Sequence, residues 1–307
     1  MQIAFVVDDM TMLRYYVPLS RRIHTFDGSI KQSFFLRLDN HKYNGLSNLA
    51  NRDRCMEILD VYCGYASVVY DDAVEYDVVF QVESGSRLKC KKRVAIQHGF
   101  DYVGHLNDLK SNVDVYICSS KETASEPSGA GLNCVVPPLP VSVWDLQNIV
   151  SVSDKPAVLV YYPDQGENEL ATQLVDCLEA ANVRVIVKQR KKHQAIMSAG
   201  IHVYDEMWYP SEAIVLASTS HITIGFGSSA YTDLVPLGIK YVNIDVRSNE
   251  RPWNAFKHPD SERYIRLVDR STVIQEIMSL DFENSKRPIN TVTDADLSAF
   301  ISTLLEV

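Results

Sequence analysis

Short, continuous apolar runs alternate along this chain with segments in which apolar residues recur every three or four positions. Such runs are typical of strands buried on both faces of a parallel sheet, and the wider spacing is typical of helices packed on that sheet. In the helical segment 11–24, Pro18 is a candidate for a break or kink. The strands expected in the first half are 3–7, 33–38, 78–82, 94–96, 113–118 and 133–136, and the helices are 11–24 and 48–61.

A proline-rich break over 137–155 separates this series from a second one. The second series predicts strands at 157–162, 183–187, 202–204, 221–224 and 240–244, and helices at 167–181, 210–217, 230–237, 272–280 and 294–305. Two alternating series joined by one link predict an α/β protein with two doubly wound parallel-sheet, Rossmann-like domains, 1–145 and 146–307. The pattern leaves open whether the last helix packs on its own domain or crosses back to the first.

Composition narrows the class of protein. The 39 acidic residues outnumber the 30 basic ones, which argues against a nucleic-acid partner. There is no apolar window long enough to span a membrane, and the N-terminus lacks the basic and apolar regions of a signal peptide. The six cysteines are scattered without a CxxC pair, so we expect reduced thiols, a cytoplasmic protein and no metal site.

The segment 222–245 reads as strand, Gly/Ser loop, short helix and strand. Gly227, Ser228, Ser229 and Ala230 stand where the loop opens the helix. Free backbone N–H groups, two hydroxyls and the positive end of a helix dipole would suit a phosphate there. The alternative is an ordinary strand–helix turn capped by serine.

Other residues of the second half follow its strands. Lys188 and Arg190 stand at the carboxyl end of the strand 183–187, where cations would neutralise a pyrophosphate. The loop that begins at Tyr204 and contains Glu206 and Met207 would approach a nucleotide base. A solvated basic loop and a packed aromatic corner are the alternatives.

The first half offers candidates for a general base. His98 follows the strand 94–96, and Asp101 could orient its imidazole. Glu83 follows the preceding strand. Asp9, with its neighbour Asp8, ends the first strand and is either a base or a helix cap. A lone histidine after a strand is more often structural.

Three motifs, in this order, resemble nucleotide-sugar enzymes of the two-Rossmann glycosyltransferase-B (GT-B) architecture. They are Gln97-His98-Gly99, the Tyr-Pro-Ser-Glu at 209–212, and the Gly-Phe-Gly-Ser-Ser-Ala at 225–230 followed by Leu-Gly-Ile-Lys-Tyr-Val at 237–242. The chain is similar over about 76–250 to CDP-glycerol glycerophosphotransferases, to Kdo- and sialic-acid-type capsule transferases, and to UDP-N-acetylglucosamine 2-epimerases.

The resemblance implies that Ser228 and Ser229 hold the donor phosphate, that 204–207 approaches the base, and that His98 is the catalytic base. Two departures qualify it. The His-Pro usual in those transferases is missing after the strand that here ends in Lys188-Gln189-Arg190, so the leaving-group role passes to Lys188 or Arg190. The Gly-Gly and paired acids of the epimerases are also missing from 227–230, which favours a transferase.

We therefore expect a metal-independent, inverting glycosyltransferase that uses a nucleotide sugar as substrate, without a cofactor, and a carbohydrate or lipid-linked hydroxyl of a surface polysaccharide as acceptor. A CDP-polyol phosphotransferase, a UDP-sugar 2-epimerase and a non-catalytic nucleotide-sugar-binding subunit are the alternatives. A homo-oligomer, and peripheral association with the inner membrane face through exposed aromatics such as Trp144 and Trp253, stay open.

Overall fold

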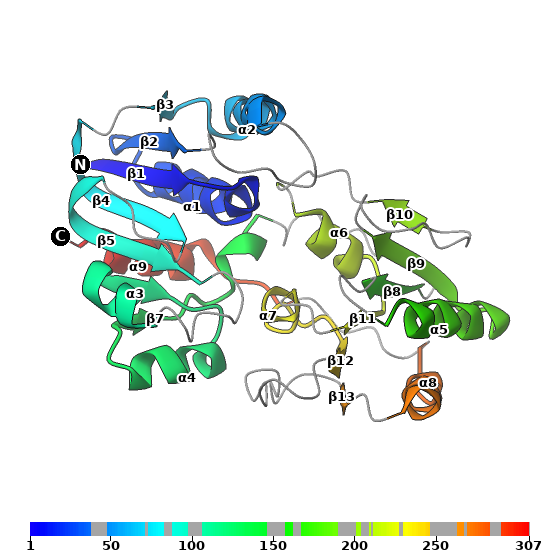
Figure 1. Ribbon diagram of the computed structural model, residues 1–307. Coiled ribbons are helices and arrows are strands. Elements are labelled where there is room, and N and C mark those ends of the chain that lie inside the picture. The colour runs from blue at the N-terminus through cyan, green and yellow to red at the C-terminus, as the bar shows by residue number, and fades with distance from the viewer. Residues whose placement is uncertain are drawn as a thin grey trace. The chain divides into compact units, whose positions relative to one another are not determined.

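The computed structural model describes residues 1–37, 48–70, 73–82, 88–97, 106–145, 157–161, 167–189, 201–203, 209, 211–226, 230–245, 263–266, 269–282 and 290–306. The chain forms two compact units (Figure 1). Unit 1 comprises Met1–Asp145, Trp208–Pro210 and Val292–Val307, and unit 2 comprises Leu146–Met207 and Ser211–Thr291.

Unit 1 is built on a seven-stranded sheet in which every pair of neighbours is parallel. The order across the sheet is β3-β2-β1-β4-β5-β6-β7. Phe5 of β1 stacks between Phe34 of β2 and Phe80 of β4, with ring centroids 5.0 and 5.1 Å away. The strands are β1 (Gln2–Val7), β2 (Lys31–Leu36), β3 (Ser67–Val69), β4 (Glu75–Val82), β5 (Lys89–Ile96), β6 (Val115–Ile117) and β7 (Cys134–Val135).

Among the helices of unit 1, α1 contacts η1, α2, η4 and α9. They are η1 (Met10–Met12), α1 (Leu13–Phe26), α2 (Asn48–Cys63), α3 (Leu106–Asn112), α4 (Lys121–Gly129), η4 (Val141–Val143) and α9 (Asp294–Leu305). The expected break at Pro18 is wrong, because α1 is continuous through it. Proline removes one helical hydrogen bond at a cost of about 3 kcal/mol, and the buried face from Leu13 to Ile23 offsets that loss.

The C-terminal helix α9 belongs to unit 1. Thr293 and Asp296 form a capping box at its start, each side chain paired with the other's backbone N–H. At its end, Lys92 of β5 donates to the carbonyl of Glu306 at 2.5 Å. Both ends of the helix are therefore held by polar contacts within unit 1.

Trp144 lies fully buried under α9, with its ring edge-on to Phe300 at 5.9 Å and its indole N–H donating to the Leu139 carbonyl at 2.7 Å. The expectation that it is an exposed membrane contact is wrong, because indole packing and its hydrogen bond both favour burial here. Trp253 lies outside the described residues. None of the helices in the described ranges is long and apolar enough to cross a membrane.

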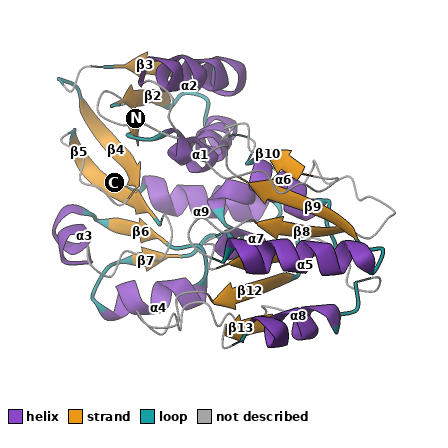
Figure 2. Cartoon of the chain, turned by 45° about the vertical axis from the view of Figure 1, so that its right-hand side comes forward, coloured by secondary structure: helices purple, strands orange, loops and turns teal. Residues whose placement is uncertain are grey.

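Unit 2 repeats the strand order on a smaller scale, since its parallel sheet runs β10-β9-β8-β11-β12-β13. The helices α5 and α8 lie beside each other next to the sheet (Figure 2). Their buried apolar side chains form one core cluster with those of β8, β9, β11 and β12. The strands are β8 (Ala157–Tyr161), β9 (Arg184–Gln189), β10 (Ile201–Val203), β11 (Ile222–Phe226), β12 (Tyr241–Asp245) and β13 (Arg263–Arg266). The helices are α5 (Asn168–Ala180), α6 (Glu212–Ser218), α7 (Tyr231–Leu234) and α8 (Arg270–Met278).

Some elements differ from the sequence-based expectation. The strands β3 and β13 and the helices α3 and α4 were not predicted. The helix α4 contains Pro127 and Gly129, and the Ser120–Thr123 capping box starts it in spite of these poor helix formers. The helix expected over 230–237 is a single turn, α7, followed by turns, so its dipole is smaller than the sequence suggests.

Candidate functional site

The strand order reverses once in each sheet, between β1 and β4 in unit 1 and between β8 and β11 in unit 2. In open parallel sheets, ligands bind beyond the carboxyl ends of the strands at such a reversal. In unit 2 these ends are Tyr161 on β8 and Phe226 on β11. The predicted phosphate-binding residues Gly227, Ser228 and Ser229 follow Phe226 directly in the sequence, and they lie outside the described residues.

Ala230 is the first described residue after β11, and it directly precedes the helix α7. Its carbonyl accepts from the N–H groups of Asp233 and Leu234 at 3.1 and 3.2 Å, so it opens the turn of α7. The chain thus passes from a buried strand to a helical turn through the three residues Gly-Ser-Ser. The two serines are therefore within three positions of the carboxyl end of β11 in the sequence.

One cross-strand row of polar and aromatic residues lies near this edge. Register pairs place Lys188 beside Tyr161, Tyr161 beside Gly225, and Gly225 beside Asn243. Paired residues in parallel strands point to the same face, and the flanking residues of these strands belong to the core on the α5 and α8 side. The row therefore faces away from that core. We call these four residues the carboxyl-edge row.

Lys188 is the predicted donor-binding cation whose position the structure describes. Its Nζ lies 5.7 Å from the centroid of the Tyr161 ring, within cation–π range. The Tyr161 hydroxyl donates to the Ala213 carbonyl of α6 at 2.7 Å, which fixes the ring beside the lysine. The structure therefore places a cation one strand away from the reversal point. Arg190, Tyr204, Glu206 and Met207 lie outside the described residues.

Position 225 requires glycine because the Tyr241 side chain packs directly against its Cα atom. A Cβ atom on Gly225 would lie 1.8 Å from the Tyr241 hydroxyl oxygen and 2.7 Å from the ring carbon that bears it. Both residues are on the face of the carboxyl-edge row, and Tyr241 is fully buried. The packing of Tyr241 is therefore sufficient to explain the glycine at position 225, without any contact to a ligand.

In unit 1, the reversal point carries a partly buried ion pair, between Arg37 and Asp8, that the sequence did not single out. Arg37, just after β2, donates from Nε to Asp8 Oδ1 at 2.5 Å and from Nη2 to Oδ2 at 2.7 Å. Asp8 is buried directly after β1. Tyr16 of α1 lies fully buried nearby, and burial first, then the Asp8 charge, raise the pKa of its hydroxyl. The sequence did contain a signal for Arg37, because it is a charged residue directly after the apolar strand β2.

Asp9 takes the cap position that was one of its two predicted roles. Its carboxylate accepts from the Thr11 N–H at 2.8 Å and starts η1. The other three candidate bases, Glu83, His98 and Asp101, lie outside the described residues. Gln97, immediately before His98, is buried, and its side-chain oxygen accepts from the Ser119 N–H at 3.1 Å. The chain is therefore well anchored up to the residue before the histidine.

No model of a protein family matches this sequence, and no curated protein matches it. Solved structures do match its fold. A Listeria monocytogenes protein assigned as a UDP-N-acetylglucosamine 2-epimerase superposes with a TM-score of 0.61 at 9% identity, covering 98% of this chain and 94% of that one. The wall teichoic acid polymerase TagF gives 0.60 at 12% identity, covering 99% and 88%.

A third solved structure, UDP-GlcNAc 2-epimerase from Neisseria meningitidis bound to UDP-GlcNAc, gives a TM-score of 0.57 at 10% identity and covers 99% of both chains. Likeness at these identities shows the fold alone. Together with the two parallel sheets of matching strand order, it confirms the expected fold class. The chain has the GT-B fold.

Proposed function

We propose that this chain is a glycosyltransferase that moves a sugar from a nucleotide-activated donor to a hydroxyl of a surface-polysaccharide acceptor. The observation that carries the proposal is the Gly-Ser-Ser segment 227–229, which directly follows β11 at the reversal of strand order in unit 2. Ligands of doubly wound sheets bind at this position. Lys188 in the carboxyl-edge row adds the positive charge that a diphosphate requires.

In the proposed reaction, Ser228 and Ser229 bind the donor phosphates, and residues 204–207 approach the base. A base of unit 1 accepts the proton of the acceptor hydroxyl. His98 is the first candidate, and Asp101, Glu83 and Asp9 are the others. The acceptor oxygen then forms a bond to the anomeric carbon while the bond from that carbon to the phosphate oxygen breaks. Lys188 and Arg190 stabilise the charge on the leaving nucleotide. Single displacement inverts the anomeric configuration, and no metal or cofactor takes part in this scheme.

The first experiment is a thermal-shift panel of UDP-, GDP-, CMP- and CDP-linked donors with their free nucleotides. A ligand present at 100 times its dissociation constant stabilises the folded protein by about 2.7 kcal/mol, which raises the melting temperature measurably. Positive donors are then tested for hydrolysis and for transfer to carbohydrate and lipid-linked acceptors. Stabilisation by no member of the panel would contradict the proposal.

The second experiment removes the proposed phosphate ligands. We expect Ser228→Ala/Ser229→Ala to weaken nucleotide binding about tenfold or more, since each lost hydrogen bond to a charged group is worth about 1.5–3 kcal/mol. The matched control is Ser218→Ala/Ser220→Ala, because these serines precede β11, at its opposite end, and their hydroxyls donate to α6 carbonyls. Equal affinity in the two double variants would remove Ser228 and Ser229 from the site.

The panel also separates the alternatives. Turnover that disappears in His98→Ala while nucleotide binding persists favours an enzyme with this base. Transfer of a polyol phosphate from a CDP-linked donor identifies a phosphotransferase, and exchange of the sugar C2 hydrogen with solvent identifies a 2-epimerase. Binding without turnover under any acceptor identifies a passive binding subunit.

A further inference from the structure

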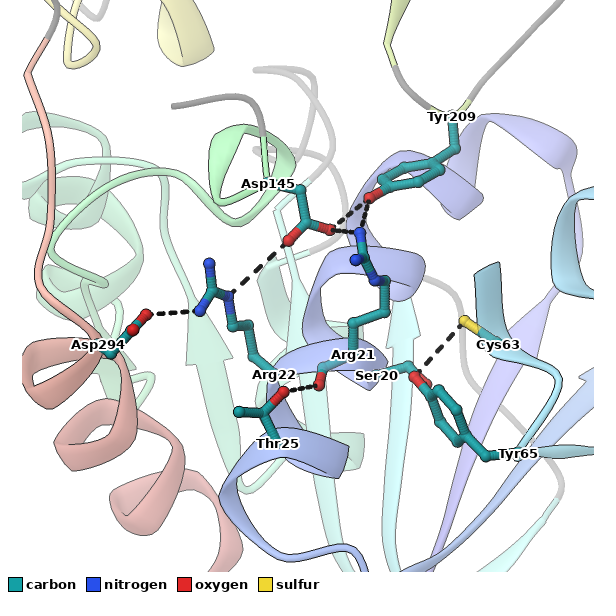
Figure 3. Close-up of polar contacts among 9 residues, drawn as sticks. All are labelled: Ser20, Arg21, Arg22, Thr25, Cys63, Tyr65, Asp145, Tyr209 and Asp294. Atoms are coloured by element: carbon teal, nitrogen blue, oxygen red, sulfur yellow. Dashed lines mark hydrogen bonds and ion pairs between the residues drawn. The ribbon is translucent and has the colours of Figure 1, made fainter. Parts of the chain in front are cut away.

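Two successive arginines of α1 hold three segments that lie far apart in the sequence (Figure 3). Asp145 Oδ2 accepts from Arg21 Nη1 at 3.0 Å and from the Tyr209 hydroxyl. Arg21 Nη1 also donates to the Tyr209 oxygen at 3.0 Å. Arg22 Nε lies 3.8 Å from Asp145 Oδ1, and its Nη1 donates to Asp294 Oδ1 at 2.6 Å. We call these five residues the α1 clamp.

The carboxylate at the centre of the α1 clamp is shielded from water, and its rim is exposed. The Asp145 side chain is 10% exposed and that of Arg22 is 17% exposed, whereas those of Arg21 and Asp294 are 43% and 85% exposed. Tyr209 is buried, and its ring is edge-on to Tyr62 of α2 at 4.7 Å. Burial, followed by the nearby Asp145 charge, raises the pKa of the Tyr209 hydroxyl, so this group stays a hydrogen-bond donor. The bond from the Tyr209 hydroxyl to the Asp145 carboxylate is therefore both shielded and charge-assisted, and such bonds are stronger than surface ion pairs.

The residues held by α1 mark the places where the chain passes between the two units. Asp145 is the last residue of the first run of unit 1. Tyr209 is the middle residue of Trp208–Pro210, a three-residue segment of unit 1 with unit 2 on both sides of it in the sequence. Asp294 is the third residue of Val292–Val307, where the chain returns to unit 1. All the passages are thus anchored to one helix.

Tyr209 also has a special place relative to the candidate donor site. The predicted base-binding loop 204–207 precedes it by two residues, and Ser211, the N-cap of α6, follows it by two. The carbonyl of Ala213 in that helix accepts from Tyr161 of the carboxyl-edge row. Tyr209 is therefore close in the sequence both to the predicted base-binding loop and to the helix that holds Tyr161 of the carboxyl-edge row.

We propose that Tyr209 is a positioning residue for the donor: through the α1 clamp it fixes the chain at the start of α6, whose Ala213 carbonyl holds Tyr161 beside Lys188. This inference rests on the proposed function, because it assigns Lys188 to the donor phosphates. Tyr209 does not itself touch the donor in this proposal. It limits the conformations of α6 and, through α6, of Tyr161 beside Lys188, so less ordering is left to occur on binding.

The test is Tyr209→Phe, which removes the hydroxyl and keeps the ring against Tyr62. The matched control is Tyr65→Phe, since the Tyr65 hydroxyl also bonds to α1, at Ser20 Oγ 3.0 Å away, and Ser20 is not one of the five residues of the α1 clamp (Figure 3). Two readouts are needed. One is the dissociation constant for UDP, GDP, CDP and CMP, each measured separately. The other is amide hydrogen exchange in peptides covering 209–218.

We expect Tyr209→Phe to weaken binding of the preferred nucleotide about three- to tenfold and to raise exchange in α6, with kcat changed less than KM once a donor is known. Tyr65→Phe should leave both readouts at the wild-type value. Asp145→Asn should weaken binding at least as much, because it also removes the ion pairs with Arg21 and Arg22. The double variant with Tyr209→Phe should bind no more weakly than Asp145→Asn alone, because the two changes share the Tyr209–Asp145 bond. A Tyr209→Phe variant that matches Tyr65→Phe in both readouts would overturn the inference.

Failure of the proposed function would look different. If the unsubstituted protein binds none of the four nucleotides, both the proposed function and the positioning role of Tyr209 are wrong. If nucleotide binds and Tyr209→Phe changes neither affinity nor exchange, the proposed function stands and the positioning role is wrong.

Discussion

The contact between Gly225 and Tyr241 shows how a single side chain restricts the sequence at the candidate site. The tyrosine ring occupies the space of a side chain at 225, two residues before Gly227. Gly129, at the end of α4, is the opposite case, because a Cβ atom there would meet nothing within 4 Å. The two glycines allow the same substitution to be compared at a crowded and an open position.

We expect Gly225→Ala to destabilise the protein by about 3 kcal/mol or more, since overpacking costs about 1–3 kcal/mol and this overlap is severe. Gly129→Ala should lie within about 0.5 kcal/mol of wild type. In Gly225→Ala/Tyr241→Leu, removal of the ring should make the alanine less harmful, so the two changes should be sub-additive. Urea unfolding measures all four proteins, and strict additivity would contradict the packing described for this pair.

The buried thiol of Cys55 provides a residue-scale test of pH dependence. It is fully buried on α2, and burial raises its pKa to about 12, whereas an unfolded cysteine ionises near pH 8.5. Because the folded pKa is the higher one, the contribution to stability is complete below the unfolded pKa and is lost as the pH rises toward 12.

Between pH 8 and pH 10, we expect Cys55 to account for about 2 kcal/mol of the loss in the free energy of unfolding. Cys55→Ala should therefore lose about 2 kcal/mol less than wild type over that interval, measured by urea unfolding at the two pH values. Cys177→Ala, at a partly exposed thiol on α5, is the control and should follow wild type. Identical pH dependence in all three proteins would contradict the burial effect.

At the scale of elements, α9 and α8 make a matched pair of helices that pack in different units. Ile301 of α9 and Ile277 of α8 are both buried. The helix α9 contacts α1 of unit 1, and α8 contacts α5 of unit 2. Replacing either isoleucine therefore tests the packing of one unit only.

We expect Ile301→Ala and Ile277→Ala each to cost about 2–5 kcal/mol. Hydrogen exchange should rise in α1 for Ile301→Ala and in α5 for Ile277→Ala, and each variant is the control for the other. Increased exchange in α5, but not in α1, in Ile301→Ala would show that α9 packs with unit 2.

The elements also show what local sequence patterns can predict. The continuous apolar runs of β1, β4, β8 and β11 identified these strands, and helical spacing identified α1, α5, α8 and α9. The strand β3 is only three residues long and lies at a sheet edge, partly exposed, so it has no buried run to show. The helix α4 is stabilised by its cap rather than by its composition.

At the scale of the whole molecule, the strand-order rule placed the candidate site, because it requires only the sequence of strands and their carboxyl ends. It identified Lys188 and the segment 227–230. It could not identify Tyr161 and Asn243, because their membership of the carboxyl-edge row depends on cross-strand register. The α1 clamp could not be predicted either, since the partners of its two arginines lie more than a hundred positions away in the sequence.

The membership of α9 in unit 1 has a consequence for how the nascent protein acquires its structure. Domains generally fold as units, and earlier ones fold first during synthesis. Here the ribosome releases all of unit 2 before it releases residues 292–307. Unit 1 needs these residues to cover Trp144 and to provide Asp294 as a partner for Arg22. The half that is translated first is therefore finished last, and until then it exposes apolar surface to which a chaperone could bind.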